Sequence, residues 1–151
     1  MTITPINVAV VTQAVVDQLK NDTRLANVEV SRSQEIGSDP SSCPWVGVYR
    51  LRVKYPIRTL GSGGMRGQRV MMAIVLQQAN PSSGADCEDD LEDLIGKVMS
   101  VLLSDVTLNN TVQFLDEFDV SYEDYTKTKT GVYMQTAAIQ FVALMTTTIG
   151  G

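Results

Sequence analysis

The side chains that could do chemistry in this chain are carboxylates, because the 151-residue sequence contains no histidine. Histidine is the commonest general base and metal ligand, so Ser-His and Cys-His triads and nearly every catalytic zinc site are excluded. Asp86 and Asp89 are candidates for an enzyme that works with carboxylates alone. No phosphate loop, nucleotide fingerprint or nucleophile elbow accompanies them. We therefore expect no catalytic activity, no cofactor and no obligatory metal.

A dense group of carboxylates marks the start of a segment with helical periodicity. Six of the eight residues in this stretch are acidic, namely Asp86, Glu88, Asp89, Asp90, Glu92 and Asp93. Asp86 is predicted to cap the helix, and negative charge at this end suits the helix dipole. The group is interpreted as a solvated helix start, with a contact to basic residues of another subunit as the functional alternative. A Ca²⁺ site is least favoured, because successive helical carboxylates point in different directions.

Basic side chains recur at every second position after Tyr49. Apolar residues occupy the alternate positions from Trp45 to Ile57, and from residue 50 onward the positions between them are basic except for Pro56, which predicts a strand with one apolar and one basic face. The basic row holds 6 of the 12 Lys and Arg residues of the chain: Arg50, Arg52, Lys54, Arg58, Arg66 and Arg69. Three interpretations stay open: an edge strand protected by charge, a nucleic-acid surface, and a subunit contact. A net charge of −5 argues against nucleic acid.

A glycine-rich loop from Thr59 to Gly67 joins this strand to the next one. Its candidate docking residues are Gly61, Ser62, Gly63, Gly64, Met65 and Gly67. The loop is flexible and too polar to bury itself, so we expect it to be mobile in the free protein. It is not a dinucleotide-binding loop, because it joins two strands and opens no helix.

The remaining periodicities predict the elements that must position these groups. A helix is expected after Thr4 and Pro5, a short strand near Val28 and Val30, and a long loop over residues 33–44. An apolar strand begins at Arg69, and a helix begins at Asp86. Strands follow at residues 111–120 and 132–145. The order α-β-β-β-α-β-β predicts an α+β fold, in which a mainly antiparallel curved sheet of four to five strands packs against two helices.

Length and composition set the broad class. A chain of 151 residues with 44% hydrophobic and 19% charged residues is expected to form a single domain, residues 1–151. No apolar run approaches the roughly 20 residues of a membrane span, and the first residues do not resemble a signal peptide. Cys43 and Cys87 are expected to be free thiols in a reducing compartment.

The order and character of these segments resemble the tail terminator (tail completion or neck) proteins of long-tailed bacteriophages. The resemblance rests on six segments: the N-terminal helix after a short leader, the basic strand at 48–55, the glycine-rich hairpin, the apolar strand after it, the acidic helix start at 87–95 and the last strand pair ending at 140–145. The long loop at 33–44 departs from the family pattern.

Membership would imply a structural virion protein that forms a hexameric ring. Such a ring caps the tail tube, stops its polymerisation and offers a surface for joining the head. The implied partners are further copies of the chain, the tail tube protein and the head connector or neck proteins. DNA would only pass through the lumen, with no sequence-specific binding and no membrane contact. The implied location is the virion tail or neck, after assembly in the bacterial host cytoplasm.

The resemblance also implies roles for the residues named above, and it leaves alternatives. The loop from Thr59 to Gln68 would become ordered on docking, and the family supplies no catalytic residues. The basic row and the acidic helix start would meet between subunits. The alternatives are a head-completion or connector protein, another neck or tail-tube ring protein, and a histidine-free carboxylate enzyme.

Overall fold

The elements follow the predicted order. The computed structural model describes residues 2–3, 7–37, 39–54, 65–123, 126–128 and 130–150, with side chains at 7–37, 39–54, 68–123, 127–128 and 130–145. In chain order the elements are β1 (Thr2–Ile3), α1 (Ala9–Lys20), η1 (Thr23–Leu25), β2 (Glu29–Arg32), η2 (Pro40–Ser42), β3 (Trp45–Lys54), β4 (Met65–Asn80), α2 (Gly84–Ser104), β5 (Phe114–Tyr122), β6 (Thr126–Lys127) and β7 (Tyr133–Gly150).

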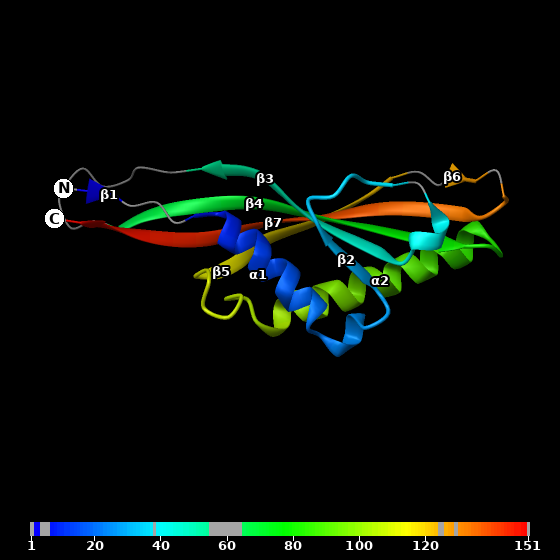
Figure 1. Ribbon diagram of the computed structural model, residues 1–151, viewed down its shortest axis with the longest axis horizontal. Coiled ribbons are helices and arrows are strands. Elements are labelled where there is room, and N and C mark those ends of the chain that lie inside the picture. Colours follow the sequence, from blue (N-terminus) through cyan, green and yellow to red (C-terminus); the bar gives the residue numbers. More distant parts are fainter. Residues whose placement is uncertain are drawn as a thin grey trace.

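Two long antiparallel strands, β4 and β7, form the centre of the sheet (Figure 1). They pair without interruption from Met65–Thr148 to Asn80–Tyr133. On one side, β3 is antiparallel to β4, and β2 is parallel to β3. On the other side, β5 is antiparallel to β7, as are the two-residue strands β1 and β6. Five longer strands and two helices confirm the predicted α+β fold with a mainly antiparallel sheet.

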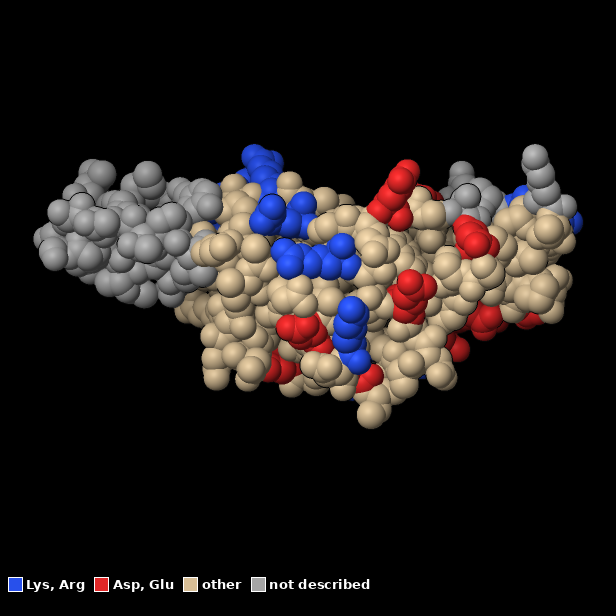
Figure 2. Space-filling model, in the orientation of Figure 1, with Lys and Arg blue, Asp and Glu red and all other residues tan. Residues whose placement is uncertain are grey.

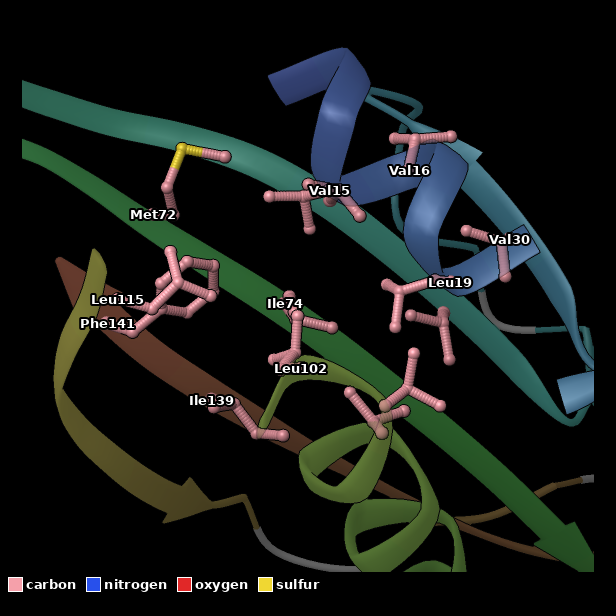
Figure 3. Close-up of a cluster of buried hydrophobic side chains, with 14 of the residues drawn as sticks. Val15, Val16, Leu19, Val30, Met72, Ile74, Leu102, Leu115, Ile139 and Phe141 are labelled. Carbon is pink, nitrogen blue, oxygen red and sulfur yellow. The ribbon is translucent and has the colours of Figure 1, made fainter. Parts of the chain in front are cut away.

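Both helices cover the same face of the sheet. Alternate β4 residues, including Met72 and Ile74, have no exposed surface. In Figure 3 their side chains point toward Val15 and Leu19 of α1 and Leu102 of α2. Burying one side chain of this kind contributes about 1.5–3 kcal/mol. That burial offsets the low helix propensity of the valines in α1.

The helix starts differ from the predicted ones. α1 begins at Ala9, where the N-cap Val8 makes no side-chain capping bond, and the predicted cap Thr4 lies outside the described residues. α2 begins at Gly84, because Ser83 Oγ accepts a hydrogen bond from Asp86 N at 3.0 Å. Ser83 is therefore the cap, and the prediction of Asp86 as the cap is wrong. Among the described residues, no helix is both long and apolar enough to cross a membrane.

Two strands also start elsewhere than predicted. β4 begins at Met65, earlier than the predicted Arg69. β5 begins at Phe114 rather than at residue 111, because a left-handed turn occupies the chain before it. Leu108, Asn109 and Asn110 have φ values of 49°, 55° and 62° in this turn.

Candidate functional site

The basic segment of β3 contains a β-bulge. Arg50 lies opposite Met72 of β4, but Arg52 lies opposite Met71, so Leu51 is an extra residue in the ladder. Because strand side chains alternate between faces, one extra residue exchanges the two faces for everything that follows. The side chains of Arg50 and Arg52 therefore belong to opposite faces of the sheet, although the two residues are two positions apart.

The exchange of faces corrects the predicted pattern of this strand. Before the bulge, Val46 and Val48 point into the core, whereas after it Val53 packs against the core. The prediction that odd-numbered residues form one apolar face throughout is wrong. Leu51, which was assigned to that face, is 53% exposed.

The exposed basic group is smaller than the sequence suggested. Arg50, Arg52 and Lys54 are exposed, and we call them the β3 basic group. No described residue forms an ion pair with any of them. Arg58 and the side chain of Arg66 lie outside the described residues. In Figure 2 the Lys and Arg side chains gather near the middle of the molecule, over the region of β3.

Arg69 belongs to a different arrangement. Its Nη2 lies 2.6 Å from Glu117 Oε2, so its charge is already matched within the chain. Glu117 reaches it from a second bulge, where β5 shifts register and Glu117 has a φ of 57°. The next residue, Phe118, returns to the core and stacks on Phe141 with ring centroids 5.5 Å apart.

The acidic residues at the start of α2 lie on the surface. Asp90 is half-buried and accepts a hydrogen bond from Asn80 Nδ2 at 2.9 Å, while the other five are exposed. A hydrogen bond to the Glu92 carboxylate raises the pKa of Tyr122. Asp90 and Glu92 thus have contacts within the chain. No three potential metal-ligating side chains gather among the described residues.

The structure does not bring the β3 basic group and the acidic start of α2 together in one chain. The basic group lies beside Arg69 and Met72 of β4, whereas Asp90 is bonded to Asn80 at the far end of that strand. The stretch of β4 from Arg69 to Asn80 spans about 36 Å at roughly 3.3 Å per residue. The two groups therefore lie beside different parts of β4.

Sequence reasoning missed a second acidic group, on β5. Asp116, Glu117 and Asp119 are exposed, and we call them the β5 acidic group. No described residue forms an ion pair with Asp116 or Asp119. The sequence feature that could have identified this group is the presence of three carboxylates within one predicted strand. The sequence does not give the register of β5 in the sheet, which decides where these residues lie.

The long loop at 33–44 lies along the sheet face opposite the helices. The Tyr49 hydroxyl donates a hydrogen bond to Gln34 O, and Gln77 Nε2 donates one to Gly37 O at 2.9 Å. Trp45 Nε1 donates to Ser31 Oγ at 3.2 Å beside them. These contacts attach the first part of the loop to β3 and β4.

Two grooves on the surface of the described residues stand out, and neither is lined by Asp86 or Asp89. The larger, about 370 Å³, lies between α1 and the end of α2. One of its carboxylates, that of Asp105, already accepts hydrogen bonds from Thr107 within the chain, and these bonds lower the pKa of Asp105. The smaller groove has a volume of about 200 Å³. The carboxylates proposed for an enzyme thus lie outside both grooves.

Cys43 and Cys87 are free thiols, as predicted. Burial raises the pKa of Cys43 to about 11 and also raises that of Cys87. A raised pKa keeps a thiol protonated at neutral pH and lowers its reactivity as a nucleophile.

The predicted docking loop lies mostly outside the described residues. Gly61, Ser62, Gly63 and Gly64 are not described, so the expected mobility of the loop stays a prediction. Met65 and Gly67 were predicted to belong to the loop, but their backbones are part of β4 and pair with Thr148 and Thr146 of β7.

No protein-family model matches the chain, and no curated protein sequence matches it significantly. Among solved structures, the chain is similar to one described as "Virion of native gene transfer agent (GTA) particle". The two are 14% identical, the match covers 97% of this chain and 100% of that chain, and the TM-score is 0.47. At that level of similarity no function is drawn from the match.

Proposed function

We propose that the protein is a structural virion component of a long-tailed phage. In this proposal residues 1–151 form one tail-terminator-like domain, and six copies close into a ring. The ring caps the tail tube, ends its polymerisation and presents a surface to the head connector. Its work is done by contacts between proteins, without catalysis, cofactor or metal.

The observation that carries the proposal is the separation of exposed opposite charges on one chain. The β3 basic group and the acidic residues of α2 and β5 lie apart, and the described salt bridges leave Arg52 and Asp116 unmatched. Copies joined head to tail need two different, complementary surfaces, and such contacts close into a ring when the rotation permits. The element order that resembles tail terminators is present in the folded chain.

The native mass of the purified chain tests the ring. Sedimentation velocity over a wide range of protein concentrations should detect a species of six copies, and negative-stain images of that species should show a central hole. A chain that stays monomeric at every concentration would contradict the proposal. Moderate salt should weaken assembly only slightly, because exposed ion pairs contribute about 0–1 kcal/mol each.

The capping role needs a separate measurement. Phage particles assembled without this protein should contain tail tubes of uncontrolled length, because nothing then blocks addition at the tube end. Adding the purified protein during assembly should restore a uniform length. Tubes of normal length without the protein would favour the alternative of a head-completion or connector protein.

A further inference from the structure

The sheet has two open edges within the part of the chain that the structure describes. β2 pairs with β3 only from Trp45 to Val48, so β3 continues to Lys54 with no strand on its outer side. On the opposite side of the sheet, β5 pairs with β7 alone. Figure 1 shows β3 and β5 on opposite sides of the β4–β7 pair. An open edge presents main-chain N–H and C=O groups that can pair with another strand.

These two edges carry opposite charges at the same level of the sheet. Arg52 lies opposite Met71 of β4, Met71 opposite Val142 of β7, and Val142 opposite Asp116 of β5. One row of residues across the sheet therefore begins with an exposed cation and ends with an exposed anion.

We propose that the β3 edge from Arg50 to Lys54 pairs with the β5 edge of a second copy of this chain. This contact rests on the proposed ring and specifies how neighbouring copies meet: the sheet continues from one subunit into the next.

Strand direction agrees with this pairing. β3, β4, β7 and β5 alternate in direction, so β3 and β5 run antiparallel. Rotation about an axis roughly along the strands preserves those directions, and β3 of one copy would meet an antiparallel β5 of the next. Main-chain hydrogen bonds supply the attraction in such strand addition.

Charge explains why this contact would be selective. Charged side chains on an open edge normally prevent strands from pairing indiscriminately. Here two copies of the β3 edge repel each other, as do two copies of the β5 edge, whereas β3 against β5 brings Arg52 to the level of Asp116. Such complementarity fixes partner and register.

The β5 acidic group fits this position better than the acidic start of α2. Neighbours related by rotation about an axis along the strands meet at the same level of the sheet. Asp116 lies in the cross-strand row of Arg52, whereas Asp90 is bonded to Asn80, at the far end of β4. In this proposal the partner of the β3 edge is the β5 acidic group rather than the acidic start of α2.

Engineered cysteines test the contact directly. In a background with Cys43→Ser and Cys87→Ala, Arg52→Cys is combined with Asp116→Cys or, to find the register, with Asp119→Cys. Within one chain, positions 52 and 116 are three strand spacings apart, about 14 Å, which is too far for a disulfide. Any bond between them must join two copies. The matched control combines Arg52→Cys with Asp89→Cys, which removes the same charges but uses the α2 start.

Mild oxidation should convert one β3–β5 pair into a covalent series that ends at the closed ring, while the Asp89 pair remains mostly uncross-linked. Charge reversal gives a second readout. Arg52→Glu should weaken assembly by about tenfold or more, and adding Asp116→Arg should restore it.

The results of these experiments distinguish failure of the β3–β5 contact from failure of the proposed ring. If the unmodified chain forms rings but only the Asp89 pair cross-links, or no pair does, the β3–β5 contact is wrong and the ring stands. If native mass shows only monomer and no pair cross-links, both proposals are wrong.

Discussion

Arg69 and Glu117 form an ion pair of 2.6 Å between β4 and β5, two strands that do not pair with each other because β7 lies between them. Both side chains are partly exposed, so the pair itself contributes about 0–1 kcal/mol. The backbone conformation of Glu117 costs more free energy than the ion pair contributes. A non-glycine residue in the left-handed region is disfavoured by about 1–2 kcal/mol, and Glu117 has a φ of 57°.

Replacing Glu117 separates these two effects. Glu117→Ala loses the ion pair and keeps the backbone cost, whereas Glu117→Gly loses the ion pair and removes that cost. The glycine variant should therefore be the more stable of the two, by about 1 kcal/mol in urea unfolding. At Asp119, whose φ is negative, the order should reverse, because glycine weakens an ordinary strand. The same order at both positions would contradict the bulge.

Gly47 is required by its neighbours on the uncovered face. A Cβ at this position would lie 2.9 Å from the Tyr49 ring and closer still to Trp45 Cη2. Gly47→Ala should lower the free energy of unfolding by about 1–3 kcal/mol, because two aromatic rings must move. The control is Gly96→Ala in α2, where no atom lies within 4 Å. That change should stabilise by roughly 0.5–1 kcal/mol. Equal effects would show that Gly47 is not crowded.

Capping of α2 distinguishes Ser83 from Asp86. Ser83→Ala removes the hydroxyl that accepts the Asp86 N–H and should destabilise by about 1 kcal/mol. Asp86→Ala leaves that bond intact and loses only a favourable charge near the helix start, about 0.3–1 kcal/mol. Thermal unfolding monitored by circular dichroism measures both variants. A larger effect at Asp86 would restore the sequence-based assignment of the cap.

Acid stability should depend on Asp22. Hydrogen bonds from Arg24 lower the pKa of Asp22 from 3.8 to about 2. A carboxyl with a lowered folded-state pKa stabilises the fold above its unfolded value, and that contribution is lost as the pH falls toward 2. Asp22→Asn should therefore reduce the slope of stability against pH between about 4 and 2. Arg24→Gln should reduce it less, because the Arg24 backbone N–H still bonds the carboxylate. An unchanged slope in Asp22→Asn would contradict this assignment.

The order of elements could be predicted because hydrophobic periodicity survives in each segment. The apolar stripe of α1 and the alternation within β7 both lead directly to the observed core. The two bulges could not be predicted, since neither Leu51 nor Glu117 is a glycine and each adds one residue without a local signal. One extra residue reverses a face, so the predicted basic face was wrong although the strand was right.

The candidate site was harder to predict than the fold, because it depends on pairing between distant segments. Nothing local to Asp116 indicates that it shares a cross-strand row with Arg52, since β4 and β7 must pair correctly first. The acidic start of α2 is the denser cluster in sequence, which is why it was preferred. Its position beside Asn80 follows only from the packed structure.

The uninterrupted pairing of β4 with β7 also has a mechanical consequence. When two paired strands are pulled in opposite directions along their length, all the hydrogen bonds between them carry the force together, whereas peeling breaks them one at a time. The ladder from Met65–Thr148 to Asn80–Tyr133 contains no bulge at which it could yield. Sliding β4 past β7 would therefore require the whole ladder to break at once.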